Sequence, residues 1–348
     1  MRIKWHYLVL ISIFTLTACG AGSDATLPPP TITSTPISTE LPPIATAIPA
    51  GFNADNPIQI VIVPADPEQA SDVVNDFEDQ LEELTDVSIT VMLAETQAEA
   101  SGLLCNLASG RQSAVWVNGM TYATSNLQNC GVGVLQADTP DGTGEEGVLL
   151  LNIDYEDTGI AGAVENTLCR ISVDDLYSWT LPIIFYSIEG FSALDIDDVN
   201  ELDDNDALIE AVANGNCAAV GMTEEAWESY LDEDETLAEN VLVAGTSPAI
   251  PYHVFAFPFS MPLDAIDDIE TALIRMDVAS GRSDIEQNNA DSESTEEPDT
   301  PSIDLDVDEE MMTILFGEGA FEQVDESDFT ELIDFLESSN INFSELGN

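Results

Sequence analysis

The most informative segment of the chain begins with Leu168-Cys169-Arg170-Ile171 and passes the acidic pair Asp174-Asp175. It continues as Leu176-Tyr177-Ser178-Trp179-Thr180-Leu181-Pro182 and closes with Asn214-Gly215-Asn216-Cys217-Ala218-Ala219-Val220-Gly221. A short apolar run that leads into an acidic N-cap signal and an apolar segment predicts a strand followed by a helix. With the second helix and strand behind it, residues 168–221 are expected to form a strand, helix, helix, strand unit.

Such a unit places the N-terminus of a helix beside a possible binding site. Its free N–H groups, together with Tyr177, Ser178 and Trp179, are candidates for contacting a ligand. The alternative is that the aromatic rings belong to the core and that the acidic residue only caps the helix. The sequence leaves both interpretations open.

The rest of the folded chain alternates between strand and helix patterns. Apolar strands are expected at 58–63, 88–93, 114–117 and 132–136, with helices at 97–108, from 121, and at 262–276, and two amphipathic helices near the C-terminus. This alternation predicts an α/β protein with mainly parallel sheets covered by helices. We expect one lobe from residues 57–138 and 244–348, with a disordered acidic insertion at 280–302, and a second lobe from residues 139–243.

The N-terminal segment predicts export and a lipid anchor. Residues 1–18 combine a short basic start with an apolar run that is shorter than a membrane span, which is typical of a signal peptide. Leu16-Thr17-Ala18-Cys19 resembles the bacterial lipobox, whose cysteine is lipidated; the alternative is an uncleaved anchor followed by a chance cysteine. Residues 19–56, rich in Pro and Thr, predict an extended tether. The expected location is therefore extracytoplasmic, on the membrane through acyl chains on Cys19.

The charge balance excludes one class of partner. The chain has 67 acidic residues and 6 Lys plus Arg, which gives a formal net charge of −61. Such a field repels a phosphate backbone, so no nucleic-acid partner is expected, and an anionic membrane surface is equally unfavourable.

The cysteines predict disulfides instead of a metal site. Four remain besides Cys19, and in an exported chain this number favours two bridges. Three pairings are possible, and we expect Cys105 with Cys130 and Cys169 with Cys217, because each pair then lies inside one predicted unit. The chain has no CxxC spacing, so a zinc site is not expected, and no cofactor is predicted.

The histidine count argues against hydrolytic catalysis. Only His253 remains after the signal peptide, and no nucleophile motif accompanies it. The chain is therefore not expected to be an enzyme.

Taken together, the lipobox, tether, two α/β lobes and a crossing at Ser247-Pro248-Ala249-Ile250-Pro251 resemble the substrate-binding lipoproteins of phosphate, phosphite and phosphonate ABC importers. The resemblance covers roughly residues 58–276. Trp116-Val117-Asn118-Gly119-Met120-Thr121-Tyr122 is similar to the family's Trp, Gly, Pro, Ser-Tyr stretch. There the tyrosine faces the ligand from the first lobe, so the resemblance implies this role for Tyr122, with Trp116 and Asn118 beside it.

Two further matches lie in the second lobe. Counting back from Pro182 places Asp175-Leu176-Tyr177-Ser178 where the family has a Ser-Thr-Ser-Gly run that binds the oxyanion at a helix N-terminus. Asp204-Asn205-Asp206-Ala207 resembles the family's Ser-His-Asp-Ala run, and Asp206 keeps the family's residue. The differences matter, because a carboxylate at position 175 repels a phosphonate and positions 204 and 205 lack the hydroxyl and the imidazole.

The candidate ligand set follows from these observations. Aromatic residues would suit an apolar or cationic part of a ligand through stacking or cation–π contact, and Arg170 is the best single partner for an anion, unless it pairs with a surface carboxylate. The full set is Trp116, Asn118, Tyr122, Arg170, Asp175, Tyr177, Ser178, Trp179, Asp206, Tyr252 and His253.

The sequence thus predicts a type II periplasmic-binding-protein fold, in which two α/β lobes joined by hinge crossings carry C-terminal helices. It is expected to bind a small molecule and to present it to an ABC permease in the membrane. The alternative is a lipid-anchored sensor or scaffold of the same fold without transport, and a neighbouring permease and ATPase in the genome would separate the two.

Overall fold

A computed structural model describes residues 56–85, 87–106, 112–192, 196, 198–282, 307–324, 326–339 and 341. All of them belong to a unit that spans Ile48–Asn348. The predicted signal peptide, lipobox and most of the tether lie outside the described residues, as does nearly all of the predicted insertion. Within the described part, no helix is long and apolar enough to cross a membrane.

The first sheet has six strands within the described residues, in the order β13-β4-β12-β3-β1-β2. These are β1 (Ile58–Ile62), β2 (Ile89–Leu93), β3 (Ser113–Val117), β4 (Gly131–Asp138), β12 (Val254–Pro258) and β13 (Ala320–Gln323). β1 is parallel to β2 and β3, but β12 is antiparallel to β3 and β4, and β13 is antiparallel to β4. β1, β2, β3 and β4 thus run in one direction, which fits the expected mainly parallel sheet, whereas β12 and β13 run in the opposite direction because β12 enters the sheet from its other end.

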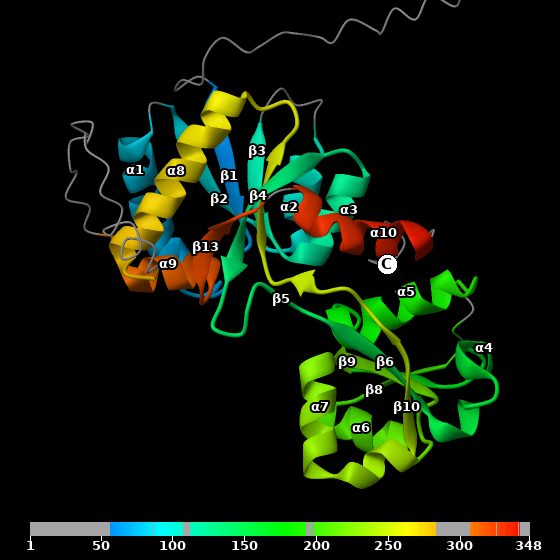
Figure 1. Ribbon diagram of the computed structural model, residues 1–348. Coiled ribbons are helices and arrows are strands. Elements are labelled where there is room, and N and C mark those ends of the chain that lie inside the picture. The colour runs from blue at the N-terminus through cyan, green and yellow to red at the C-terminus, as the bar shows by residue number, and fades with distance from the viewer. Residues whose placement is uncertain are drawn as a thin grey trace, which may run out of the picture. The chain divides into compact units, whose positions relative to one another are not determined.

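Helices cover both faces of this sheet (Figure 1). The helices are α1 (Ala70–Leu84), α2 (Gln97–Leu104), α3 (Gly119–Leu127), α8 (Leu263–Ser280) and α9 (Glu309–Phe316). Successive residues of β1 point to opposite faces, so Ile60 packs in the core with Phe77 of α1 and Leu273 of α8. Val61 packs on the other face with Leu104 of α2. Burial on both faces explains why this strand is apolar throughout.

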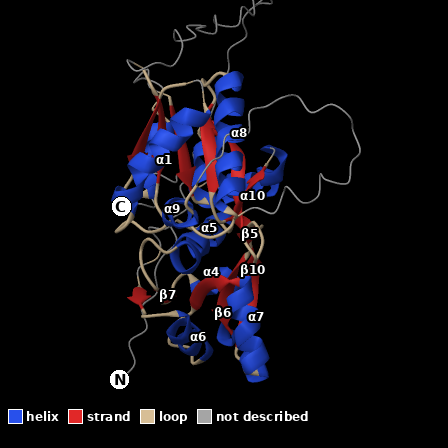
Figure 2. Cartoon of the chain, turned by 90° about the vertical axis from the view of Figure 1, so that its left-hand side faces the viewer, coloured by secondary structure: helices blue, strands red, loops and turns tan. Residues whose placement is uncertain are grey.

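The second sheet has the strand order β10-β6-β9-β7-β8 in the described part of the chain. Its strands are β6 (Gly147–Asn152), β7 (Leu168–Arg170), β8 (Val199–Glu201), β9 (Ala219–Thr223) and β10 (Val241–Thr246). Its helices are α4 (Gly159–Ala163), α5 (Leu181–Ile188), α6 (Asn205–Ala213) and α7 (Glu224–Glu233), with η2 (Ile153–Tyr155), the π-helix η3 (Leu176–Thr180) and η5 (Glu235–Glu239). Successive side chains of β6 point to opposite faces of this sheet. Val148 packs in the core that α6 and α7 cover, and Leu149 packs in the core that α5 covers (Figure 1, Figure 2).

The unit predicted from residues 168–221 is present, with one addition. β7, η3 with α5, α6 and β9 follow in that order, but β8 lies between the two helical parts and pairs in parallel with β7. The three residues of β8 are Val199, Asn200 and Glu201, and none is buried. A short polar edge strand has no apolar pattern, so the sequence did not reveal it.

Two short strands form where the chain crosses between the sheets. β5 (Gly144–Glu145) and β11 (Ile250–Pro251) pair antiparallel, with Ile250 opposite Glu145 and Pro251 opposite Gly144. Gly119, at the start of α3, packs on this ladder so closely that a Cβ atom there would lie 2.3 Å from the Pro251 carbonyl oxygen. The start of α3 is therefore held against the crossing segments.

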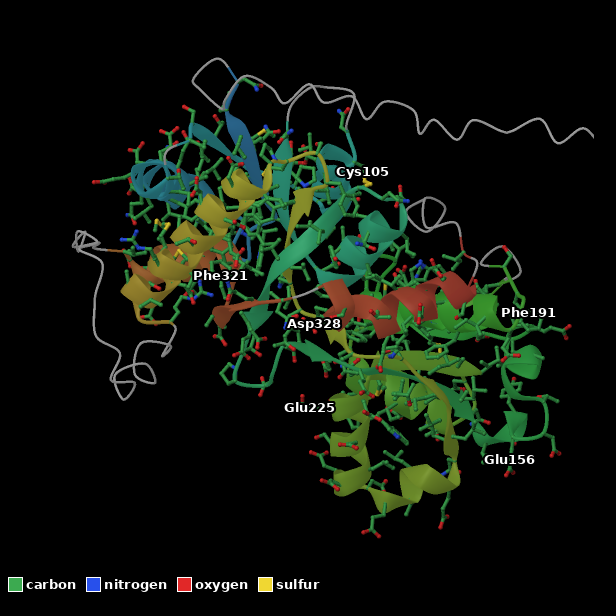
Figure 3. The ribbon with its side chains drawn as sticks, turned by 45° about the horizontal axis from the view of Figure 1, so that its top comes forward. Cys105, Glu156, Phe191, Glu225, Phe321 and Asp328 are labelled. Atoms are coloured by element: carbon green, nitrogen blue, oxygen red, sulfur yellow. A yellow bond between two sulfur atoms is a disulfide. The ribbon has the colours of Figure 1, made fainter. Side chains whose placement is uncertain are left out.

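Both predicted disulfides are confirmed. Cys105, labelled in Figure 3, is bonded to Cys130 with the Cα atoms 4.6 Å apart. Cys169 is bonded to Cys217 with the Cα atoms 5.8 Å apart. The first bridge joins the end of α2 to the start of β4, and the second joins β7 to the turn before β9. Each bridge thus stabilises one of the two sheets.

The C-terminal part forms the two expected helices, α9 and α10 (Thr330–Ser339), with the short helix η7 (Glu326–Phe329) before α10. α9 joins the first core through Met312 and Phe316. α10 contacts both α3 and α5, and its residues Leu332 and Leu336 lie in one apolar cluster with Met120 and Ile184. The last helix therefore bridges elements of both sheets.

Candidate ligand-binding site

The first group of predicted site residues lies at the carboxyl end of β3, where α3 begins. Asn118 is the N-cap of α3, and its side chain accepts a hydrogen bond from the Thr121 N–H at 2.8 Å. The Asn118 N–H donates to Gln97 Oε1 at 3.0 Å. Asn118 therefore fixes the start of the helix, as its residue type favours.

The aromatic residues predicted beside it are buried in the core. Trp116 is 1% exposed and its ring contacts those of Phe255, Phe316 and Phe321. Tyr122 is 0% exposed, and its hydroxyl accepts a hydrogen bond from the Gly133 N–H at 3.0 Å. Packing on the two faces of the first sheet uses both rings, and their role toward a ligand stays a prediction.

His253 is half-buried beside this core. Its ring stacks on Trp116 with the centroids 5.4 Å apart. Burial lowers the pKa of the imidazole to about 4, so the ring is neutral at pH 7. It therefore presents no charge to an anionic solute.

The second group lies at the start of η3. Asp175 is the N-cap, and its carboxylate accepts a hydrogen bond from the Ser178 N–H at 2.6 Å. Ser178 is 1% exposed, and its hydroxyl accepts from the Ile171 N–H at 2.9 Å. The capping interpretation of Asp175 thus has direct structural support, and both side chains are used to hold β7 and η3 together.

The side chains of Arg170 and Asp206 interact with residues of the second sheet and its helices. The Arg170 guanidinium lies 2.8 Å from a Glu201 carboxylate oxygen and 4.2 Å from the centroid of the Trp179 ring. Asp206 accepts a hydrogen bond from the Tyr230 hydroxyl at 2.6 Å. Burial, followed by this bond, raises the pKa of Tyr230 to about 12. The structure therefore assigns Arg170 the surface pairing that the sequence left open.

A third group assembles at the crossings, where β5, η3 and the residues after β11 meet. Its members, which we name the crossing cluster, are Glu145, Tyr177 and Tyr252. The Tyr177 hydroxyl donates to the Glu145 carbonyl oxygen at 3.4 Å, and the Tyr252 N–H donates to the Thr143 carbonyl at 3.1 Å. All three side chains are half-buried, so they are partly accessible to solvent.

Two glycines make room for Tyr177. A Cβ atom on Gly147 would lie 2.9 Å from the Tyr177 ring and 2.3 Å from Leu181. A Cβ atom on Gly221 would lie 2.0 Å from the Tyr177 carbonyl oxygen. The absence of side chains on β6 and β9 therefore lets η3 lie against these strands and places Tyr177 beside β5.

The electrostatics of the crossing cluster are negative. Burial first, and then the carboxylates of Glu225 and Asp141, raise the pKa of Glu145, against a hydrogen bond with Thr223. Burial and then Glu145 raise the pKa of both Tyr177 and Tyr252. Glu145, Tyr177 and Tyr252 therefore each lie near acidic groups that disfavour a further negative charge. A cation bound among them would reduce this electrostatic repulsion.

Apolar packing fills the space next to the two predicted helix starts. Met120 of α3, Ile184 of α5 and Leu336 of α10 are buried together, and Leu176 and Tyr177 pack against them. Two half-buried members of the predicted set, Tyr177 and Tyr252, lie at the crossings. Glu145 was not in that set, because it lies in an acidic, Gly-rich segment that shows neither helical nor strand periodicity. Its place in the segment that connects β4 to β6, and so the two sheets, is the signal that could have found it.

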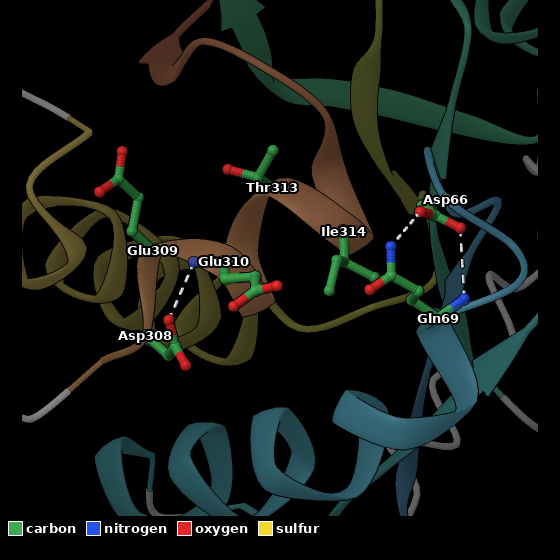
Figure 4. A pocket seen from close by; sticks show the side chains of 7 residues that line it. All are labelled: Asp66, Gln69, Asp308, Glu309, Glu310, Thr313 and Ile314. Atoms are coloured by element: carbon green, nitrogen blue, oxygen red, sulfur yellow. Dashed lines mark hydrogen bonds between the residues drawn. The ribbon is translucent and has the colours of Figure 1, made fainter.

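Two cavities border helices of the first sheet. One of about 520 Å³ lies between the start of α1 and α9 (Figure 4) and is lined by Asp66, Gln69, Asp308, Glu309, Glu310, Thr313 and Ile314. The other, of about 1080 Å³, is lined by residues that include Arg282 and Phe321. Neither is lined by the sequence-predicted ligand residues. Among the described residues no group of three His, Cys, Asp or Glu could hold a metal ion.

Comparison with known proteins adds a family and a fold. The family described as ABC transporter, phosphonate, periplasmic substrate-binding protein matches residues 60–299. Curated proteins give no match. XAC2383 from Xanthomonas citri is 10% identical to this chain, and its structures with chloride and with ATP both match with a TM-score of 0.51. Each match covers 81% of this chain, together with 97% of the chloride-bound chain and 96% of the ATP-bound chain. PhnD1 from Prochlorococcus marinus (MIT 9301), solved with methylphosphonate, is 13% identical with a TM-score of 0.42, over 81% of this chain and 98% of that chain.

Proposed function

Because the chain belongs to the family of periplasmic substrate-binding proteins of phosphonate ABC transporters, we propose that it is a lipid-anchored member that captures a small solute bearing an ammonium group. It has a type II periplasmic-binding-protein fold, and it delivers its ligand to a membrane permease. The lipobox at Cys19 supports the anchor, and the family supports an extracytoplasmic location. The observation that carries the ligand class is the crossing cluster.

The crossing cluster has the chemistry of a site for an organic cation. A half-buried carboxylate supplies the counter-charge, and two tyrosine rings supply faces for cation–π contact. Such contacts strengthen when water is excluded, and the burial that raises the pKa values of Glu145, Tyr177 and Tyr252 indicates partial exclusion. Closure about the paired strands β5 and β11 would complete that exclusion.

The groups at the family's oxyanion position favour a ligand other than a simple phosphonate. Asp175 places a carboxylate at the start of η3, and that carboxylate already accepts the Ser178 N–H. Arg170 is engaged by Glu201. Tight binding of an anion without an ammonium group would need donors in their place.

A ligand comparison by isothermal titration and thermal shift tests the proposal. Choline and 2-aminoethylphosphonate should bind and raise the melting temperature, and methylphosphonate and phosphate should give a smaller effect. Glu145→Gln should weaken binding of the ammonium compounds by roughly tenfold, because it removes a charge-assisted contact.

Glu156→Gln is the matched control. It makes the same chemical change on an exposed side chain of the second sheet's unit (Figure 3) and should leave affinity unchanged. Binding of methylphosphonate in preference to both ammonium compounds would refute the ligand class. Equal losses in the two Glu variants would instead remove the crossing cluster from the site.

A further inference from the structure

The loop that connects β12 to α8 and the first residue of that helix each expose one large apolar side chain. Phe259 is 51% exposed and Leu263 is 77% exposed, which are the two largest values among the large apolar residues of the described part. Between them Met261 is 4% exposed and packs in the first core, and its N–H donates to the Pro258 carbonyl at 2.9 Å. A well-anchored turn therefore holds both side chains in solvent.

This loop lies at the end of the sheet where the folded part begins. The Gln59 N–H of β1 donates to the Gln112 carbonyl at 3.0 Å, and the Gln112 side chain donates to the Ser260 carbonyl at 2.9 Å. The loop is thus joined to the first residues of β1 through a single residue. The described part of the chain begins at Asn56, two residues before β1.

We propose that Phe259 and Leu263 insert into the interfacial region of the lipid bilayer to which Cys19 attaches the chain. The inference rests on the proposed lipid anchor. Two side chains alone would give only weak partitioning. Weak partitioning is sufficient for an anchored chain, because the lipid anchor keeps the loop at a high effective concentration near the membrane surface.

The charges around the loop define which bilayer it fits. Asp264 lies in the first turn of α8, and Asp267 and Asp268 follow on the same helix. With a net charge of −61, the chain is repelled by anionic headgroups. Docking therefore depends on apolar insertion into a zwitterionic surface and weakens when anionic lipid is added at low salt.

Docking through this loop also sets the orientation of the first sheet. The loop lies near the amino end of β3, whereas α3 begins at the carboxyl end of the same strand. A docked chain would thus turn the start of α3 away from the membrane. The Pro-rich sequence between Cys19 and residue 55, for which an extended spacer is predicted, would let this contact be released when the chain meets its permease.

The test uses the mature chain that begins at Cys19. Because the other four cysteines form two disulfides, the Cys19 thiol can be coupled to a maleimide phospholipid in phosphatidylcholine vesicles with brominated acyl chains. In Phe259→Trp the added indole fluorescence should be quenched by bromine. Val243→Trp is the matched control, since Val243 is 47% exposed on β10 and should show no such loss.

Adding Leu263→Ser to Phe259→Trp should weaken docking by about tenfold, seen as recovered fluorescence. Absence of quenching in Phe259→Trp, or equal quenching in Val243→Trp, would overturn the inference. The premise is checked separately by mass spectrometry of the N-terminal peptide from native membranes. An unacylated Cys19 would refute the anchor and with it docking in the cell, whereas an acylated Cys19 without quenching would refute docking alone.

Discussion

Trp116 and Tyr122 beside the first sheet share a predicted role with Tyr177 and Tyr252 beside the crossings, but the structure places the two pairs differently. The first pair is 1% and 0% exposed, and each ring packs against at least one other aromatic ring. The second pair is half-buried, and burial first, then the nearby Glu145 carboxylate, raise the pKa of both hydroxyls. A motif thus places a residue on an element, and the packing of that element decides whether the side chain can meet a ligand.

The difference follows from what each element covers. β3 lies inside the first sheet with helices on both faces, so its side chains and those at the start of α3 complete two cores. The crossing segments β5 and β11 form a two-stranded ladder outside both larger sheets. Side chains there lose less exposed area, and an acidic group can remain.

The largest expected effect is that of Tyr122→Ala. Truncation of a fully buried ring should lower the free energy of unfolding by about 3 to 5 kcal/mol, measured by urea denaturation at pH 7. Tyr252→Ala serves as the comparison and should change stability far less while it weakens binding of choline. A stable Tyr122→Ala protein that has lost ligand binding would show that this ring faces the ligand after all.

His253 predicts a pH effect of intermediate size. Its pKa is about 4 in the folded chain against an ordinary value of 6.5, so protonation favours the unfolded chain. The stabilisation is complete above pH 6.5 and is lost as the pH falls towards 4; between pH 7 and pH 5 it should decrease by about 2 kcal/mol.

The measurement compares the parent with His253→Phe, which keeps an aromatic ring beside Trp116 but does not titrate. Subtracting the two pH profiles cancels the effect of the many carboxylates. A constant difference across this range would mean that the imidazole is not buried as a neutral ring, and the contrast between the two aromatic pairs would lose one of its supports.

Arg170→Gln should give the smallest effect. The ion pair with Glu201 and the contact with Trp179 together are expected to contribute about 1 kcal/mol or less, because the Glu201 side chain is 61% exposed. A double-mutant cycle with Glu201→Gln measures the pair. Loss of ligand affinity in Arg170→Gln, with stability unchanged, would instead make Arg170 an anion partner and add it to the site.

Local patterns were sufficient for most of the fold. The apolar runs at 58–63 and 132–136, the helical spacing at 262–276 and the sequence neighbourhoods of the four cysteines all correspond to elements or bridges of the structure. These signals succeed because burial of one or two faces imposes a period on the sequence. The three residues of β8 show no such period, and periodicity carries no information on the direction of β12. Neither feature was therefore predicted.

The sequence by itself determined an acidic, disulfide-bridged α/β chain with the motifs of a binding-protein family, because composition, periodicity and cysteine positions are local properties. Only the tertiary structure decided that Trp116 and Tyr122 are core residues, that Arg170 pairs with Glu201, and that Glu145 joins Tyr177 and Tyr252. The physical reason is that exposure and charge environment depend on residues distant in the chain. Gly147 and Gly221, for example, give Tyr177 its position without forming any motif with it.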